Sequence, residues 1–214
     1  MKRLFLLPFL AVMPFVAMAK APLPQKFRIH GEVLIFDTET DISGALAEIT
    51  PEDIDIFRNV LADNPQVTEV QLNSSGGSVY AGAEIAWIIM DHGLNTTVEG
   101  ECVSACVDIF LAGERRRMRL GSKIGFHQRS WAPDAVQSYY REWRDSEDWA
   151  TPFEFGSWIY QDTQEEIYEQ LTYLVSRGVE PAFAIETLRV RPDDEWYPSR
   201  LRLVAAGVLR EKVP

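Results

Sequence analysis

The sequence predicts an α/β protein whose sheet is mainly parallel. Short β-rich runs alternate with helical segments through the middle of the chain, which is typical of crossover connections between parallel strands. The 214 residues are 46% apolar and 25% charged, a composition that suits a globular domain with a sizeable core. No repeat, low-complexity tract or linker divides the chain, so a single domain is expected over residues 20–214.

Local patterns predict the elements in order. Residues 27–36 form an amphipathic β run. Residues 50–53 predict the start of a helix that runs to about Asn64, because a hydroxyl cap, a proline in the first turn and acidic residues all suit a helix N-terminus. The other elements follow from apolar periodicity and flanking glycines: strands at residues 67–72, 95–98, 116–120 and 123–128, and helices at residues 79–92, 104–113, 153–177, 181–190 and 198–206.

Two of these strands are expected to form a hairpin. Residues 116–120 and 123–128 flank Gly121 and Ser122, which are typical turn residues. A basic cluster, residues 115–117 with Arg119, falls on the first strand. The cluster is short and lies between structural signals, so we interpret it as the solvated face of this hairpin.

The first 19 residues predict a signal peptide. Lys2 and Arg3 form a basic start, residues 4–16 form an apolar run, and residues 17–19 (Ala-Met-Ala) form a small-residue cleavage motif. We expect cleavage after Ala19 and a periplasmic or secreted location. The apolar run is too short to span a bilayer comfortably, so no stable membrane span is expected after cleavage, with an uncleaved anchor as the alternative.

The charge of the chain argues against two classes of partner. The formal net charge is -11, and loss of Lys2 and Arg3 with the signal peptide would take it to -13. Nucleic acids and anionic membrane surfaces are poor partners for such an acidic protein.

The two cysteines lie four residues apart. On one helical turn, the Cα atoms of Cys102 and Cys106 would be about 6 Å apart, within the range that a disulfide bridges. An oxidising compartment favours this bond, so we expect a disulfide that clasps the turn of Ser104. Two buried thiols are the alternative. A zinc site would need further ligands, which the nearby sequence does not supply, so no metal is expected.

Two turns suggest acyl-transfer chemistry. The strand at residues 67–72 leads through Gly76 and Gly77 into a helix, so N–H groups at the positive end of that helix are free for an anion or an oxyanion. The lysine of a phosphate-binding loop is missing, which disfavours nucleotide binding. Ser104 also begins an apolar helix, so the Ala105 N–H is placed to join the Gly77 N–H around a carbonyl oxygen.

A serine needs a base before it becomes a useful nucleophile. The chain has three histidines, and His127 is the candidate because it ends a strand at the expected edge of the sheet. His92 suits a last helical turn, and His30 suits a strand without a catalytic role. Ser104 alone would also suit a helix cap, so the prediction depends on the whole set of residues.

The order and spacing of three motifs resemble the Clp protease proteolytic subunit, within the wider ClpP/crotonase fold. The motifs are Leu-Asn-Ser-Ser-Gly-Gly-Ser-Val at residues 72–79, Val-Ser-Ala-Cys at residues 103–106 leading to Leu-Ala-Gly at residues 111–113, and Ile-Gly-Phe-His-Gln at residues 124–128. The resemblance covers roughly residues 33–208. It implies a ClpP/crotonase-like sheet built from repeated ββα units, with a C-terminal helical arm.

The resemblance also implies roles for individual residues. The nucleophile falls on Ser104, the histidine on His127, and the oxyanion donors on the N–H groups of Gly77 and Ala105. The acid of the triad falls on Asp194 if the family's spacing between this acid and a later glycine, here Gly207, is lengthened by one residue. Asp193 is the second choice, and a solvated acidic turn is the alternative for both. No cofactor is implied.

The implied function is an exported, ATP-independent serine peptidase that acts on peptides or unfolded proteins and forms a homo-oligomer. Residues 129–155, rich in aromatic side chains, replace the segment that forms much of the family's ring contact, and we interpret them as an arm, lid or oligomer surface. Two alternatives stay open: a peptidase that uses Lys123 as its base, and a non-catalytic binding or scaffold protein of the same fold.

Overall fold

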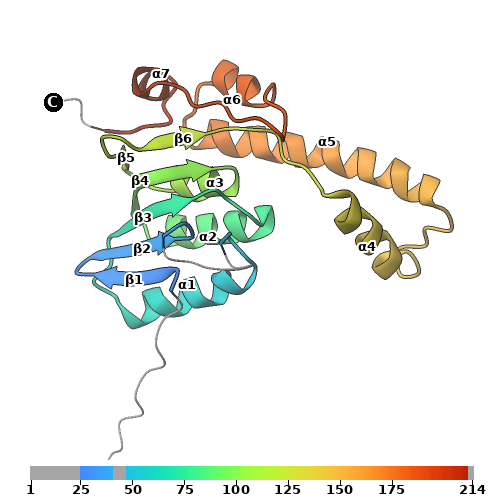
Figure 1. The fold of residues 1–214 in the computed structure, drawn as a ribbon, viewed down its shortest axis with the longest axis horizontal. Helices are drawn as coiled ribbons and strands as arrows, with labels where there is room; N and C mark the ends of the chain where they lie inside the picture. Colours follow the sequence, from blue (N-terminus) through green and yellow to red (C-terminus); the bar gives the residue numbers. More distant parts are fainter. Residues whose placement is uncertain (1–24, 41–46, 212–214) are drawn as a thin grey trace, which may run out of the picture.

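The computed structural model describes residues 25–40 and 47–211, and the predicted signal peptide lies outside them. These residues form a six-stranded sheet with seven helices (Figure 1). The strands are β1 (Phe27–His30), β2 (Val33–Asp37), β3 (Glu69–Ser74), β4 (Asn95–Val103), β5 (Arg116–Met118) and β6 (Lys123–Gly125). The helices are α1 (Glu52–Asp63), α2 (Val79–Asp91), α3 (Ala105–Leu111), α4 (Pro133–Trp143), α5 (Pro152–Ser176), α6 (Pro181–Thr187) and α7 (Arg200–Ala205).

The sheet is mainly parallel, as predicted. Its order is β1-β2-β3-β4-β5, with β6 also paired to β4. Only the β1–β2 pair is antiparallel among the named strands of the described ranges. The single β run expected at residues 27–36 is therefore a hairpin, which turns at Gly31 with a positive φ of 62°.

The prediction of a hairpin around Gly121 is wrong. β5 pairs in parallel with residues 96–98 of β4, and β6 pairs in parallel with residues 101–103 of the same strand. The turn at Gly121 moves the chain further along β4 instead of reversing it. Because β6 thereby reaches the carboxyl end of β4, the residues after β6 lie beside the turn that contains Ser104.

The solvated basic face expected at residues 115–117 is also wrong for Arg116, which is fully buried. Its guanidinium donates to the carbonyl oxygens of Leu111, Arg177 and Gly207 at 3.0, 3.0 and 2.6 Å. Burial lowers the pKa of Arg116 to about 9. A cation here is tolerated because it satisfies three backbone acceptors from separate segments. Arg117, by contrast, is exposed and pairs with Glu69.

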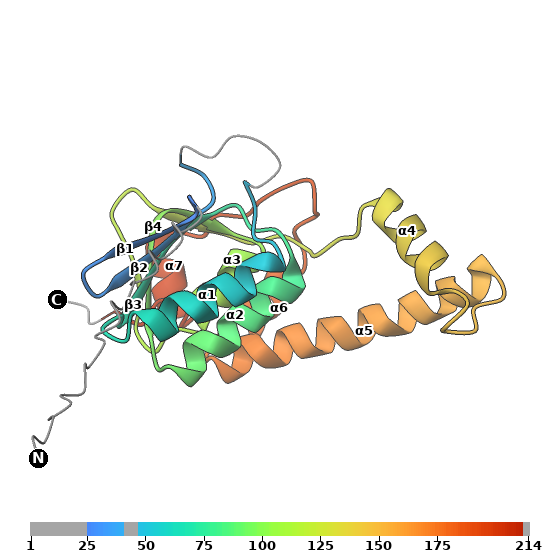
Figure 2. The same ribbon diagram turned by 90° about the horizontal axis from the view of Figure 1, so that it is seen from below.

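Helices α1, α2 and α3 lie together on one face of the sheet (Figure 2). The hydroxyl cap expected for α1 is absent, because Pro51 is the N-cap. Instead, the Thr50 N–H donates to the Asp53 carboxylate at 2.8 Å, and the same carboxylate binds buried Lys26 at 2.7 Å. Ser78 caps α2 by accepting the Ala81 N–H at 3.2 Å.

Helices α4 and α5 form an arm that extends away from the sheet (Figures 1 and 2). None of the residues of α4 is buried. The arm is held by ring contacts around Tyr139, which packs on Trp131, Trp143, Trp149, Phe155 and Trp158. In the ranges that the structure describes, no helix is both long and apolar enough to cross a membrane.

Candidate active site

Ser104 occupies a strained turn between β4 and α3. Its φ is 56° and its ψ is -128°, a conformation that a residue with a side chain rarely adopts. Such strain costs about 1–3 kcal/mol and persists only where the surroundings enforce it, commonly at functional sites. The sharp strand-to-helix turn also resembles the geometry in which a serine nucleophile is exposed above a parallel sheet.

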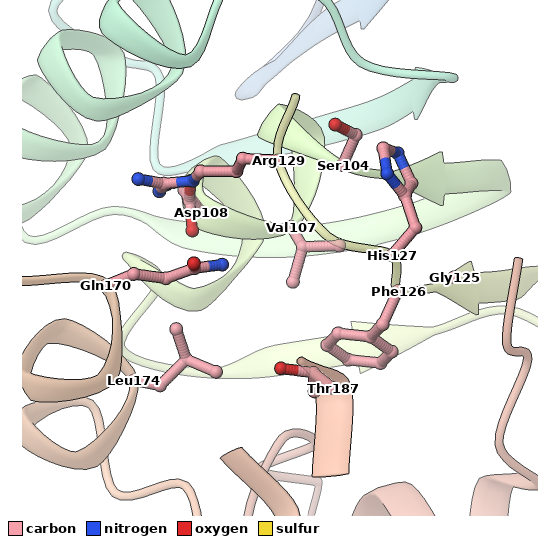
Figure 3. A pocket seen from close by; sticks show the side chains of 10 residues that line it. All are labelled: Ser104, Val107, Asp108, Gly125, Phe126, His127, Arg129, Gln170, Leu174 and Thr187. Carbon is pink, nitrogen blue, oxygen red and sulfur yellow. Dashed lines mark hydrogen bonds and ion pairs between the residues drawn. The ribbon is translucent and has the colours of Figure 1, made fainter. Parts of the chain in front are cut away.

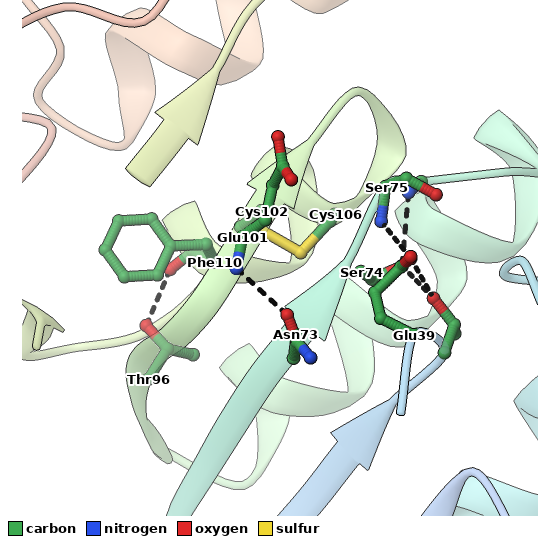
Figure 4. The surroundings of a disulfide bond; sticks show 11 residues. Glu39, Asn73, Ser74, Ser75, Thr96, Glu101, Cys102, Cys106 and Phe110 are labelled. Carbon is green, nitrogen blue, oxygen red and sulfur yellow. Dashed lines mark hydrogen bonds between the residues drawn. A yellow bond between two sulfur atoms is a disulfide. The ribbon is translucent and has the colours of Figure 1, made fainter. Parts of the chain in front are cut away.

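A disulfide encloses this turn. Cys102 lies in β4 and Cys106 in α3, with their Cα atoms 5.3 Å apart and both residues fully buried (Figure 4). The expected pairing is therefore present, although the bond joins a strand end to a helix instead of two positions on one helical turn. Asn73 of β3 holds the strand side of the turn, since its Oδ1 accepts the Glu101 N–H at 2.9 Å.

The glycine turn after β3 packs directly on the serine turn. A Cβ placed on Gly76 would lie 2.7 Å from the Ser104 Cβ and 2.9 Å from the Val103 oxygen. Gly76 and Gly77 both have positive φ values, 111° and 139°. Glycine is thus required at position 76 for close approach as well as for backbone conformation.

The N–H groups of Gly77 and Ala105, which were predicted as oxyanion donors, have no backbone acceptor within the described residues. Gly77 forms a parallel bridge with Ile49, in which the Ile49 N–H donates to Gly76 and the Ser78 N–H donates to Ile49. This pattern leaves the Gly77 N–H directed away from Ile49, and no acceptor in the described residues takes it. Ala105 is the first residue of α3, so its N–H has no partner within the helix.

His127 and Ser104 line the same cavity (Figure 3). The cavity has about 20 Å³ of space for a water-sized sphere, enough for a single water molecule. Apolar side chains of Val107, Phe126 and Leu174 form much of its wall. In this state the cavity is therefore too small for a substrate side chain.

The ring of His127 is hydrogen-bonded to the backbone of the next residue. Its Nδ1 lies 2.7 Å from the Gln128 carbonyl oxygen. Because a carbonyl oxygen can only accept, Nδ1 carries the proton and Nε2 is the basic nitrogen. No hydrogen bond joins His127 to Ser104 among the described residues.

The structure does not bring Asp194 to His127. Asp194 is exposed, its Oδ1 accepts the Glu195 N–H at 2.8 Å, and its own N–H donates to Arg191 at 3.1 Å. Asp193 pairs with Arg191 at 3.1 Å. Both aspartates therefore belong to a local turn on the surface.

Lys123 also lies apart from the serine. Its Nζ pairs with Glu101 at 3.1 Å and lies 4.4 Å from the centre of the Tyr197 ring. Its side chain is half exposed and is not part of the wall of the Ser104 cavity. These contacts disfavour a lysine base.

A partly buried ion pair beside the cavity was not predicted from the sequence. Asp108 of α3 binds Arg129 at 2.9 Å, and Arg129 also contacts Glu166 of α5 at 3.2 Å. Burial raises the pKa of Asp108, with Arg129 acting in the opposite direction. The pair joins the helix that follows Ser104 to the segment that follows His127. In the sequence, an acidic residue within an apolar helix indicates that Asp108 needs a partner, but Arg129 lies 21 residues away and is not identified by this pattern.

A larger hollow adjoins this ion pair. It has about 470 Å³ of space and lies between α2 and α5. Asp108, Arg129 and Gln170 line both this hollow and the Ser104 cavity, while Trp87 and Tyr173 supply aromatic surface. The hollow is large enough for a substrate side chain next to the serine. No group of three or more His, Cys, Asp or Glu side chains suited to a metal occurs in the described ranges.

Comparison with known proteins shows the fold. No family model matches the sequence, and no curated protein matches it. Among solved structures, a ClpP1 mutant from Listeria monocytogenes matches with a TM-score of 0.51 and 19% sequence identity. The match covers 76% of this chain and 84% of the ClpP1 chain. The chain therefore has a ClpP-like fold.

Proposed function

We propose that this protein is a serine hydrolase of the peptidase type, with Ser104 as nucleophile and His127 as general base. One observation carries the proposal: Ser104 is held in a strained strand-to-helix turn and lines the same cavity as His127. The ClpP-like fold supports this assignment. Packing alone gives no reason to keep a serine in such a conformation.

The mechanism follows from the groups at the site. His127 Nε2 takes the proton of the Ser104 hydroxyl, and the Oγ attacks the substrate carbonyl carbon. The N–H groups of Gly77 and Ala105 stabilise the oxyanion of the tetrahedral intermediate. Protonated His127 then gives its proton to the leaving amine, and water repeats the cycle to release the acyl group. Asp194 stays the sequence-based prediction for the group that orients His127.

The proposed substrates are peptides or unfolded proteins in the periplasm or outside the cell. The predicted signal peptide and the disulfide support an oxidising location. ATP-driven delivery is not expected there, so the proposed activity is ATP-independent. A homo-oligomer is also proposed, with the arm of α4 and α5 as its contact surface, because Phe153 and Tyr160 on α5 are largely exposed.

A fluorophosphonate probe tests the assignment. The oxidised protein should be labelled at Ser104, Ser104→Ala should abolish labelling, and His127→Ala should slow it by at least about 10²-fold. Lys123→Ala should react at the wild-type rate, which separates the histidine base from a lysine base. Labelling that persists at another residue in Ser104→Ala would disprove the role of Ser104.

A second candidate is a non-catalytic binding or scaffold protein of the same fold. Two observations favour it: the Ser104 cavity holds only about 20 Å³ of space, and His127 and Ser104 share no hydrogen bond within the described residues. An intact, disulfide-bonded protein that neither labels with the probe nor cleaves any member of a broad peptide library would support this alternative.

A further inference from the structure

Phe126 and Trp196 pair antiparallel just beyond β6. Each N–H donates to the carbonyl oxygen of the other residue at 3.0 Å. In an antiparallel pair, the next residues along the two segments also face each other, with Cβ atoms about 4.5–5.5 Å apart. The bridge is isolated, because the Gln128 N–H donates to Val190 instead of continuing the ladder. The register that the bridge sets would make His127 and Glu195 the next pair.

Contacts on the other side of the bridge support the register. Gly125 is opposite Tyr197, and a Cβ on Gly125 would lie 2.7 Å from the Tyr197 ring. Because side chains alternate along an extended segment, Glu195 shares the face of Tyr197. Trp196 instead packs against Phe126, with ring centres 6.0 Å apart.

The carboxylate of Glu195 has room for another donor. The Tyr197 hydroxyl contacts both Glu101 and Glu195, but it has one proton and can donate to only one of them. Burial and these hydrogen bonds raise the pKa of Tyr197, so the hydroxyl stays protonated. Glu101 has a second partner in Lys123. Glu195 has no ion pair with any residue in the described ranges.

We propose that Glu195, and not Asp194, is the positioning residue for His127, accepting the Nδ1–H of the ring when the ring becomes an imidazolium. The inference rests on the proposed function. At rest, the Gln128 carbonyl oxygen accepts that proton. Turning the ring towards Glu195 replaces a neutral acceptor with an anion, which stabilises the imidazolium formed when Nε2 takes the Ser104 proton.

The proton balance needs no further group. The Oγ proton passes to Nε2 as the bond between Oγ and the acyl carbon forms, and it then passes to the leaving nitrogen as the C–N bond breaks. No proton is transferred to Glu195 at any step. Asp194 is less suitable, because its Oδ1 accepts the Glu195 N–H within its own turn. It also lies two residues before Trp196, whose ring packs on Phe126 and not on the face of Tyr197.

The first test compares the carboxylate variants Glu195→Gln, Glu195→Asp and Asp194→Asn by rate of fluorophosphonate labelling against pH. Glu195→Gln should lower the rate by about 10²- to 10⁴-fold. It should also move the midpoint of the pH–rate profile to lower pH, because the imidazolium loses its anionic partner. Glu195→Asp should restore part of the rate. A loss in Asp194→Asn with a wild-type rate and profile in Glu195→Gln would overturn the inference.

The second test does not depend on activity, so it separates failure of this inference from failure of the proposed function. In the Ser104→Ala protein, the ring of His127 is followed by NMR, and the chain has only two other histidines, His30 and His92. Glu195→Gln should shift the His127 ring resonances and lower the pH midpoint of their titration, whereas Asp194→Asn should shift neither. Identical His127 titrations in the Glu195→Gln and parent proteins would refute the role of Glu195, whether or not the wild type labels.

Discussion

Gly76 lies so close to Ser104 that a Cβ at position 76 would sit 2.7 Å from the Ser104 Cβ. The glycine turn and the serine turn therefore form one packed unit, in which the backbone of the first supports the strained conformation of the second. The disulfide on the other side of Ser104 completes this support. The geometry of the proposed nucleophile depends on both contacts, and each can be changed separately.

Gly76→Ala should destabilise the protein by about 2–4 kcal/mol, because the new methyl group meets backbone and the φ of 111° is strained for alanine. Labelling at Ser104 should fall by more than 10-fold in the protein that remains folded. Urea unfolding and the labelling rate are the two measurements. Gly156→Ala in α5 is the matched control: nothing lies within 4 Å of its added Cβ, so it should be neutral or stabilise by about 0.5–1 kcal/mol. Equal effects at the two positions would contradict the close packing at Gly76.

Removing the disulfide with Cys102→Ala and Cys106→Ala together should lower the free energy of unfolding by about 2 kcal/mol, the entropic effect of opening so short a loop. The labelling rate should fall as well, because the turn of Ser104 loses one of its constraints. Reductant should act slowly on the native protein, since both cysteines are fully buried. Thiol titration in the folded state checks this point, and rapid reduction without unfolding would show that the sulfurs are accessible.

Asp108 predicts a specific pH dependence. Burial raises the pKa of Asp108 above its usual value, so the folded protein binds this proton more readily than the unfolded chain. The cost of the buried charge is present at neutral pH and is relieved as the pH falls through the raised pKa. The stability of Asp108→Asn relative to the wild type should therefore be greatest near neutral pH and decline towards pH 4.

Urea unfolding at several pH values measures this difference. Asp55→Asn serves as the control, because the Asp55 side chain is 83% exposed and its substitution should give a nearly flat difference. A stability difference for Asp108→Asn that grows on acidification would show that the ion pair with Arg129 outweighs burial.

Features that depend on short stretches of sequence or on the alternation of elements were predicted well. The alternation of strands and helices indicated the mainly parallel sheet, and the spacing of Cys102 and Cys106 indicated the bond between them. Ser104 and His127 were identified as a pair, and the structure places both at one cavity. Each of these depends on short-range order or on the rule that parallel strands present their carboxyl ends at one edge.

Features that depend on register were not predicted. Gly121 and Ser122 are compatible with a turn that reverses the chain and with a turn that only moves it further along β4. The pairing of β5 and β6 with β4 decides between the two. Counting along the chain selected Asp194, whereas the proposal of Glu195 depends on the register of the bridge between Phe126 and Trp196. A shift of one residue moves a side chain to the other face of an extended segment, so sequence spacing alone cannot resolve such a choice.

The burial of Arg116 also depends on residues that are distant in sequence. Its three carbonyl partners belong to residues 111, 177 and 207, so nothing near it in sequence distinguishes it from its exposed neighbour Arg117. Arg116→Ala should destabilise the protein by about 2–5 kcal/mol, because it empties a fully buried site and leaves the Gly207 carbonyl oxygen without its donor. The carbonyl oxygens of Leu111 and Arg177 each keep a second donor, from Arg177 and Arg210 respectively. Arg116→Lys should recover only part, since one ammonium lacks the planar fork that reaches several acceptors. Arg117→Ala should cost at most about 1 kcal/mol, as expected for an exposed ion pair. Urea unfolding of the three variants decides the matter, and similar losses for Arg116→Ala and Arg117→Ala would contradict a structural role for the buried guanidinium.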